Sequence, residues 1–246
     1  MKNDKNLGTR VYETIDWVGH RLPPALLRTV SLPLSYQSNT TDVFAYESAR
    51  MINIALSIVK NNQVEGDYAE FGVFQGKTFI EAYEGARRLE LSKLKFWAFD
   101  SFAGLPEVKN VDVGGEFTAG QFAFSKQSFI ENLEKYRVDI ERVGIVEGFY
   151  DDTLTSGGRD NLPKSIAVAW IDCDLYESTV PVLEFLTHRL VDGSVLIFDD
   201  WFCFKARPDK GEQRACTEWL KANPEIQLTE YHKFHWAGNS FNFNRS

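Results

Sequence analysis

Short apolar runs alternate along this chain with segments whose apolar residues recur at helical spacing. Runs such as "SIAVAWI" and "SVLIF" are continuous apolar stretches with the length of a buried strand. Segments such as "KTFIEAYEGARRLE" repeat their apolar residues three and four apart, as on one face of a helix. Strands and helices that alternate through short connections predict a parallel sheet covered by helices on both faces. The predicted strands lie at 67–73, 93–99, 142–148, 165–171 and 193–198, and the predicted helices at 77–90, 125–137, 178–190 and 211–223.

The N-terminal part of the chain lacks this alternation. Residues 1–41 contain "RLPPALL" and the polar "SYQSNTT", which predict an irregular arm. Residues 42–62 are apolar at helical spacing and predict a helix with Asp42 as its N-cap. We therefore expect an N-terminal arm and helix at 1–66, followed by one domain at 67–246.

Two further segments complete the predicted fold. The C-terminal stretches 226–236 and 239–245 read as two strands of a hairpin, which would extend the five alternating strands to seven. The segment 101–124 is long, contains several glycines and has no clear periodicity, as is typical of lid or binding loops. The prediction is an α/β fold with a doubly wound, seven-stranded, mostly parallel sheet and a lid loop at 101–124.

Composition and charge narrow the classes of function. The net charge is −8 and no run of Lys or Arg occurs, which disfavours binding to nucleic acid. Three widely spaced cysteines, Cys173, Cys203 and Cys216, indicate neither a disulfide framework nor a zinc motif. No stretch approaches the roughly 20 apolar residues of a membrane span. We expect a soluble cytoplasmic protein that binds neither nucleic acid nor a membrane.

The candidate chemistry stands at the ends of the predicted strands. Ligands of open parallel sheets bind at the carboxyl ends of the strands, near the point where the strand order reverses. Each of the five alternating strands ends at an acid or a glycine turn, so these residues would meet at one edge of the sheet. They include Glu70, Asp100, Glu147, Asp172, Asp199 and Asp200.

The glycine turn "EFGVFQGKT" allows three interpretations. Gly76, Lys77 and Thr78 nearly match a phosphate loop, with "LIFDD" as its acidic strand end, but Gly72 is one residue too close to Gly76. Alternatively, the pattern E-x-G-x-x-x-G brings the backbone close to a nucleoside without phosphates. Asp100 would then accept the ribose hydroxyls, as acids do at this place in dinucleotide sites. The glycines could also serve only a tight strand-to-helix turn.

The acids of the last two strand ends allow two interpretations. Mg²⁺ takes oxygen ligands, and crowded carboxylates repel one another unless a cation neutralises them. Asp172, Asp199 and Asp200 would then form a magnesium site. Acids also stabilise helix N-termini, which is the competing interpretation for this set. It applies most directly to Asp174 and Glu177, just before the helix predicted at 178–190.

Several blocks together resemble a known family. "GDYAEFGVFQGKT", "FDSFAGLPEV", "VEGFYDDTL", "WIDCDLYEST" and "LIFDDW" are similar to the signature blocks of the macrocin O-methyltransferase-like (TylF-type) family. The resemblance implies a class I methyltransferase fold that uses S-adenosylmethionine and magnesium (Mg²⁺). It implies an acceptor that is a sugar or glycosylated metabolite, and a homodimer.

The resemblance also implies a role for particular residues. Glu70 and Gly72 would lie against the amino-acid part of S-adenosylmethionine, and Asp100 would take its ribose diol. Asp172, Asp199 and Asp200 would hold the metal. The implied cofactor site comprises Glu70, Phe71, Gly72, Gly76, Asp100, Ser101, Glu147, Gly148, Phe149 and Asp172, with Glu147, Gly148 and Phe149 bordering the adenine.

The implied reaction is attack of a substrate hydroxyl on the sulfonium methyl, with metal coordination lowering the pKa of that hydroxyl. Asp172 and Asp174 are the catalytic candidates. Because "DCDLYES" contains no lysine, the candidate base is Asp174 or a residue of the 101–124 loop. Two other classes stay open: a phosphate-loop nucleotide hydrolase or kinase, and a cofactor-binding protein without turnover. His232 and His235 are expected to be edge or hairpin residues, and Cys173 to fill the core.

Overall fold

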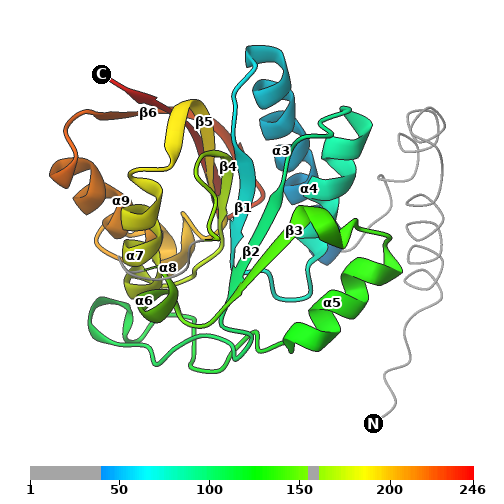
Figure 1. Ribbon diagram of the computed structural model, residues 1–246. Helices are drawn as coiled ribbons and strands as arrows, with labels where there is room; N and C mark the ends of the chain where they lie inside the picture. The colour runs from blue at the N-terminus through cyan, green and yellow to red at the C-terminus, as the bar shows by residue number, and fades with distance from the viewer. Residues whose placement is uncertain (1–39, 155–160) are drawn as a thin grey trace, which may run out of the picture.

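The computed structural model describes residues 40–154 and 161–246 (Figure 1). The predicted irregular arm lies outside the described residues apart from its last two positions. Helix α3 spans Thr40–Asn62. The helix therefore begins two residues before Asp42, and the prediction of Asp42 as its N-cap was wrong. A polar residue locates the start of a helix only to within about one turn, because several neighbouring positions near a helix start favour such residues.

All seven predicted strands join one sheet in the order β3-β2-β1-β4-β5-β7-β6. Strands β1 to β5 pair in parallel, and β7 runs antiparallel to both β5 and β6. The doubly wound, mostly parallel sheet is therefore confirmed, with the C-terminal hairpin on one edge. The strands are β1 Asp67–Phe71, β2 Phe96–Asp100, β3 Val143–Glu147, β4 Ile166–Ile171, β5 Leu190–Phe198, β6 Ile226–Phe234 and β7 Gly238–Arg245.

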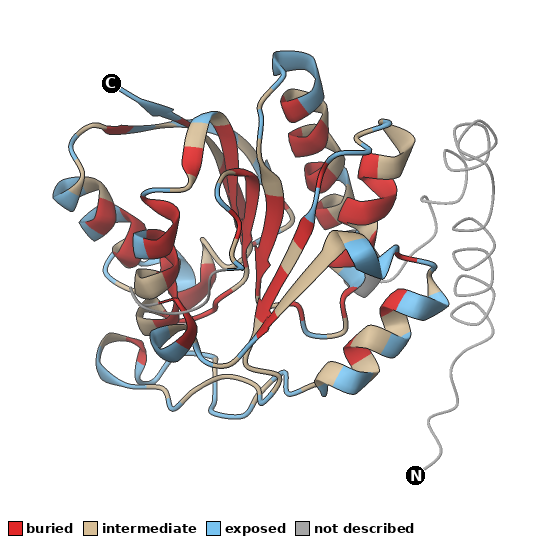
Figure 2. Cartoon of the chain, viewed as in Figure 1, coloured by how far each residue is buried: buried red, intermediate tan, exposed pale blue. Residues whose placement is uncertain are grey.

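Helices cover both faces of the sheet, which is why its central strands are buried in Figure 2. Helices α3 to α5 pack on one face and α7 and α9 on the other (Figure 1). Within the part of the chain that the structure describes, no helix has the length and apolarity needed to cross a bilayer. The remaining bounds are α4 Lys77–Arg88, η1 Asn110–Asp112, α5 Lys126–Lys135, η2 Ile140–Arg142, α6 Tyr150–Thr153, α7 Tyr176–Leu186, α8 Cys203–Ala206 and α9 Gly211–Ala222.

Alternate strand residues supply two separate cores. Tyr68 and Trp170 face the α3–α4 side, whereas Phe71 and Ile171 face the α7–α9 side. This alternation follows from the pleat, which sends successive side chains to opposite faces. Both cores are apolar, so the polar residues after the strands are left at the sheet edge.

The central strands end level with one another. Phe71 of β1 pairs with Phe99 of β2 and with Ile171 of β4, and Ile171 pairs with Phe198 of β5. The strand order reverses between β1 and β4, where a crevice forms outside the carboxyl ends. The residues that follow these ends therefore meet at the crevice.

Candidate active site

The glycine turn after β1 lies against the end of β4. Gly72 has φ 92°, a backbone conformation that L side chains rarely adopt. A Cβ atom at this position would stand 2.0 Å from the carbonyl oxygen of Asp172. Only glycine lets the turn approach so closely, and this approach joins the predicted cofactor turn to the predicted metal edge.

Asp100, at the end of β2, holds the glycine turn through its carboxylate. Its Oδ2 accepts hydrogen bonds from the backbone N–H groups of Val73 at 2.8 Å and Phe74 at 3.2 Å. Its Oδ1 accepts one from Phe102 at 2.7 Å. A carboxylate offers about four acceptor positions, so Asp100 keeps capacity for a further donor.

Glu70, Phe71 and Gly76 lie beneath the turn and do not line the cavity. The buried Glu70 carboxylate accepts hydrogen bonds from the hydroxyls of Tyr68 and Thr78. Burial raises its pKa to about 8, although these two hydroxyls act in the opposite direction. Phe71 stacks on Phe99 in the core. Glu70 therefore joins β1 to the start of α4 and does not contact the cavity.

The three cofactor candidates at the end of β3 do not all face the cavity. Gly148 and Phe149 line the cavity, as does Ser101 after β2. Glu147 points elsewhere and forms an ion pair with Lys126 at 3.1 Å in an exposed position. The adenine border implied by the resemblance therefore rests on Gly148 and Phe149 more than on Glu147.

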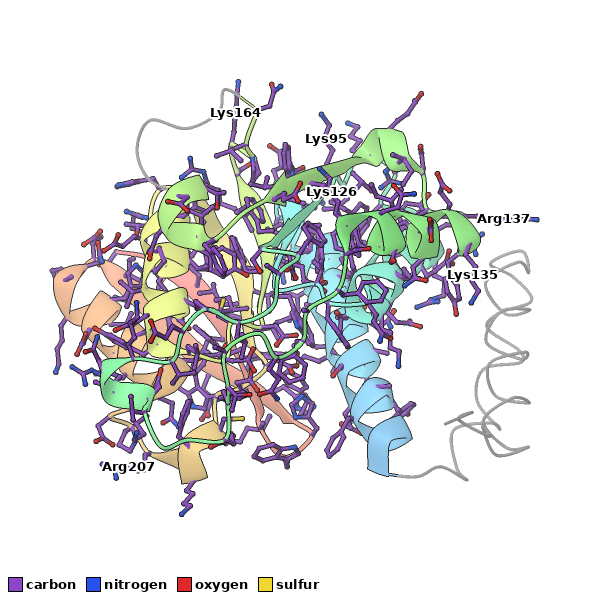
Figure 3. The ribbon with its side chains drawn as sticks, turned by 90° about the horizontal axis from the view of Figure 1, so that it is seen from below. Lys95, Lys126, Lys135, Arg137, Lys164 and Arg207 are labelled. Carbon is purple, nitrogen blue, oxygen red and sulfur yellow. The ribbon has the colours of Figure 1, made fainter. Side chains whose placement is uncertain are left out.

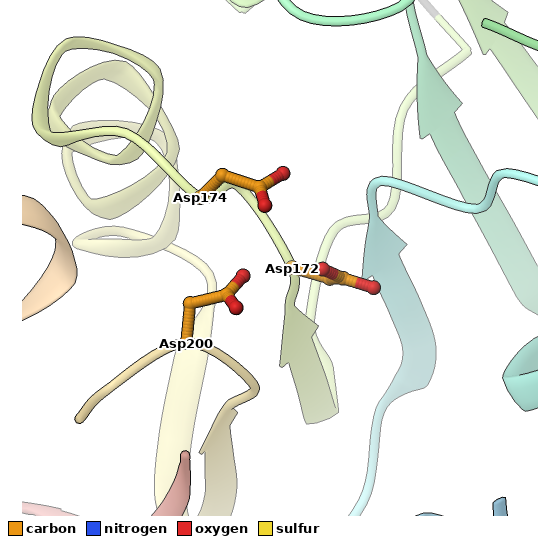
Figure 4. Close-up of side chains that lie close together, drawn as sticks. All are labelled: Asp172, Asp174 and Asp200. Carbon is orange, nitrogen blue, oxygen red and sulfur yellow. The ribbon is translucent and has the colours of Figure 1, made fainter. Parts of the chain in front are cut away.

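Three carboxylates group at the ends of β4 and β5 (Figure 4). One oxygen from each of Asp172, Asp174 and Asp200 lies within 4.8 Å of the others. Asp174 has φ 58°, so its backbone is left-handed. This conformation is uncommon outside glycine, and such residues gather at functional sites. The structure thus brings Asp174 into the cluster, where the sequence had placed it only as a candidate base.

The capping interpretation of Asp174 does not fit α7. The N-cap residue of this helix is Leu175, whose side chain forms no capping hydrogen bond. Asp112 from the 101–124 loop accepts the hydrogen bond of the Tyr176 N–H instead, at 2.6 Å. The other capping candidate, Glu177, hydrogen-bonds the side chain of Asn110.

The carboxylates of the cluster disfavour one another's charged forms. Burial raises the pKa values of Asp172 and Asp174 well above the ordinary range, and the neighbouring carboxylates raise them further. Burial and then Asp199 raise the pKa of Asp200 to about 7. In Figure 3, labelled basic side chains such as Arg137 and Lys164 project at the periphery of the molecule. A bound cation would relieve the repulsion that these shifts express.

Asp199 lies slightly apart from this group. It lines the same cavity, but its Oδ1 is 3.2 Å from Nε2 of His235. His235 follows β6, and the sequence analysis predicted it to be an edge or hairpin residue outside the site. The pattern of apolar positions carries no signal for this contact, because it depends on how the β6–β7 hairpin turns.

Glu212 is a second site residue that sequence analysis missed. It lies buried in the first turn of α9, and its Oε2 accepts a hydrogen bond from the Asp200 N–H at 3.1 Å. Its Oε1 lies 3.5 Å from the Cys173 nitrogen, so Glu212 bridges the two acidic strand ends. Cys173 is buried in the core beside α7, as predicted.

The 101–124 loop covers the cavity, which has a volume of about 660 Å³. Asp112 also accepts a hydrogen bond from the Gly211 N–H at 3.0 Å, so one buried carboxylate joins the starts of α7 and α9. Glu116 accepts a hydrogen bond from the Phe204 N–H at 2.7 Å. The loop is therefore tied to three helices on the far side of the crevice.

The phosphate-loop interpretation fits this geometry poorly. Lys77, which would have to reach phosphates, is exposed and does not line the cavity. Thr78, which would have to face magnesium, donates its hydroxyl to the buried Glu70.

The sheet order, the glycine turn and the acid after β2 define a class I methyltransferase fold. The solved structure of the O-methyltransferase NovP is similar, with 25% identity and a TM-score of 0.65 over 80% of this chain and 79% of that one. CalS11, a calicheamicin methyltransferase, has a TM-score of 0.67 and 22% identity over 96% of this chain and 90% of that one.

The chain belongs to the macrocin-O-methyltransferase (TylF) family, which it matches over residues 45–221. A Streptomyces niveus protein named demethyldecarbamoylnovobiocin O-methyltransferase is 28% identical over 73% of this chain and 70% of its own length. The 8-demethyl-8-(2,3-dimethoxy-alpha-L-rhamnosyl)-tetracenomycin-C 4'-O-methyltransferase of Streptomyces olivaceus is 33% identical over 56% of this chain. This match spans only about half, 54%, of the Streptomyces olivaceus protein.

Proposed function

We propose that this protein transfers the methyl group of S-adenosylmethionine to a hydroxyl of a sugar or another small hydroxylated metabolite, with Mg²⁺ as its metal. One observation carries the proposal: a single cavity joins the glycine turn, held by Asp100, to the acidic cluster at β4 and β5. The family supports methyl transfer to oxygen. The names of the tetracenomycin relative and of CalS11, a TDP-rhamnose methyltransferase, support a sugar acceptor.

The cofactor would lie along the ends of β1, β2 and β3. Gly72 lines the cavity and would lie against the amino-acid part of the cofactor, and Asp100 would accept a ribose hydroxyl with its remaining capacity. Ser101, Gly148 and Phe149 line the same side of the cavity and would border the rest of the nucleoside. A sulfonium nucleoside carries no phosphate, which agrees with a turn whose lysine lies outside the cavity.

The donor atoms fit Mg²⁺. They are all oxygens, which a hard divalent cation prefers, and no cysteine or histidine belongs to the described cluster. Oδ2 of Asp200 is buried and has no hydrogen-bond partner among the described residues, as expected of an oxygen that serves as a metal ligand. Asp172 and Asp200 would hold the ion, with Asp199 as a further ligand.

The chain's own residues would then align and deprotonate the acceptor. Bound Mg²⁺ would supply Lewis acidity that makes an acceptor hydroxyl easier to deprotonate. Asp174 is buried and belongs to the cluster, and we propose that its carboxylate would receive the proton. The walls around the cavity, including the 101–124 loop, would exclude water and hold both reactants in line.

Calorimetric titration of the purified protein tests this proposal. We expect micromolar binding of S-adenosylhomocysteine and no binding of ATP, each measured with and without Mg²⁺. ATP binding alone would revive the phosphate-loop alternative. Binding of the cofactor product without methyl transfer to any glycosylated acceptor, assayed with methyl-labelled cofactor, would favour a binding protein that lacks turnover.

Asp200→Asn gives a sharper test of the metal site. The variant should lose Mg²⁺ binding while its affinity for S-adenosylhomocysteine stays close to that of the wild type. Glu131→Gln, an exposed change on α5, is the matched control and should alter neither affinity. Unchanged Mg²⁺ affinity in Asp200→Asn would remove that residue from the metal site.

A further inference from the structure

His235 is a buried imidazole at the edge of the acidic cavity. Its side chain is only 6% exposed, and its Nε2 lies 3.2 Å from Oδ1 of Asp199. The rings of Phe44 from α3 and Phe234 from β6 pack edge-on against it. The ring is therefore packed between these two rings, and its direct hydrogen bond to the acidic residues goes to Asp199.

The backbone around the ring fixes its tautomer. Nδ1 receives hydrogen bonds from the N–H groups of Ala237 at 3.0 Å and Gly238 at 3.2 Å. A nitrogen that accepts two donors cannot carry a proton, so the proton of a neutral ring must sit on Nε2. Nε2–H then donates to Asp199, and the direction of this hydrogen bond follows from the backbone.

The turn of the hairpin is tied to the acidic segment at a second point. The carbonyl oxygen of Ala237 accepts a hydrogen bond from the Phe202 N–H at 2.8 Å. The hairpin turn therefore contacts both ends of the segment 199–202, through His235 at one end and Ala237 at the other. Motion of the turn and orientation of Asp199 are therefore linked.

We propose that His235 is a positioning residue for the metal site. It holds Oδ1 of Asp199 as a hydrogen-bond acceptor and leaves Oδ2 as the oxygen that a cation can take. The proposal rests on the proposed function, since it requires a metal at the acidic cluster. Hydrogen-bond partners behind a metal ligand fix its orientation, and their loss typically weakens metal binding about 10- to 100-fold.

Two substitutions separate this role from a structural one. In His235→Asn, the Asn oxygen can replace Nδ1 and accept from Ala237 and Gly238, but the side chain is too short to reach Asp199. In His235→Gln, the amide nitrogen can replace Nε2 and donate to Asp199, but the acceptor for the turn is lost. His188→Gln, an exposed change after α7, is the control for a histidine-to-amide substitution.

The experiment measures Mg²⁺ and S-adenosylhomocysteine affinities by calorimetry and the melting temperature of each variant. We expect His235→Asn to bind Mg²⁺ about 10-fold more weakly, with cofactor affinity and melting temperature close to those of the wild type. His235→Gln should keep Mg²⁺ affinity and melt at a lower temperature. His188→Gln should match the wild type in all three measurements.

Four results would count against the proposal in distinguishable ways. Unchanged Mg²⁺ affinity in His235→Asn would remove the positioning role alone. A parallel fall of both affinities and of the melting temperature would make His235 merely structural. Wild-type protein that binds cofactor but no Mg²⁺ would overturn the metal part of the proposed function. The ¹⁵N spectrum of labelled histidine reports the Nε2–H tautomer without any metal, and a proton on Nδ1 would refute the tautomer argument directly.

Discussion

Substitution of Gly72 by alanine tests whether the glycine turn touches the end of β4. The new Cβ would stand 2.0 Å from the Asp172 carbonyl oxygen and 3.1 Å from its carbonyl carbon. Both atoms belong to the backbone, so neither can rotate away. Gly114 provides a matched control: its φ is +79° beside +92° for Gly72, but nothing described lies within 4 Å of its Cβ position.

The two glycines share one cost and differ in another. A left-handed backbone costs an L residue about 1–2 kcal/mol, which both variants incur. Forcing an extra carbon into a packed position costs typically another 1–3 kcal/mol, which only Gly72→Ala incurs. The expected losses in free energy of unfolding are therefore about 2–5 kcal/mol for Gly72→Ala and about 1–2 kcal/mol for Gly114→Ala.

Urea unfolding followed by tryptophan fluorescence measures both losses, because the midpoint shifts while the slope stays constant. Gly72→Ala should also weaken binding of Mg²⁺ and of S-adenosylhomocysteine together, since the turn and Asp172 would be forced apart. Equal losses of stability in the two variants would refute the close contact between the turn and β4.

Three further outcomes are expected. The pKa of Glu70 is about 8 in the folded protein and 4.5 ordinarily, so the unfolded chain releases this proton at a lower pH. The contribution of Glu70 to the free energy of unfolding is therefore full below pH 4.5 and is lost as the pH rises toward 8. Glu70→Gln should therefore reduce the fall of unfolding free energy by up to about 1.4 kcal/mol per pH unit between these values, measured by urea titration at several pH values; an unaltered slope would contradict the shift. Asp100→Ala should weaken S-adenosylhomocysteine far more than Mg²⁺ in calorimetry, and equal cofactor affinity would refute the ribose role. Asp112→Ala should cost about 1–3 kcal/mol, because two helix starts lose their acceptor; Glu107→Ala, an exposed change in the same loop, should cost little by the same urea assay.

The sequence was sufficient for the sheet and for the edge where the acids meet. Continuous apolar runs mark buried strands wherever they occur, and the polar residue that ends each run is set by the same pattern. Parallel topology then places all such ends on one side. Asp100, Asp172 and Asp200 could be found in this way.

The direction of each side chain at that edge could not be predicted. Asp174 turns inward because its backbone is left-handed, a conformation that apolar periodicity does not encode. Asp199 is drawn toward a hairpin that follows it by more than thirty residues, His235 being 36 positions away. Glu70 and Glu147 also lie at or next to strand ends, but Glu70 is buried under the turn and Glu147 pairs with Lys126 outside the cavity. Strand ends locate residues along the chain, whereas contacts from distant elements decide their orientation.

The two hydrogen bonds that Asp112 accepts bear on how the cavity opens and on when it forms during folding. Its carboxylate holds the amides of Tyr176 and Gly211, which lie 64 and 99 residues further along the chain. Contacts of such separation carry a large loop-closure entropy, so the cover of the cavity should assemble after the sheet. If the loop moves away from the cavity, these two amides should lose their protection from hydrogen exchange together. Their common exchange rate would then measure how often the cavity opens.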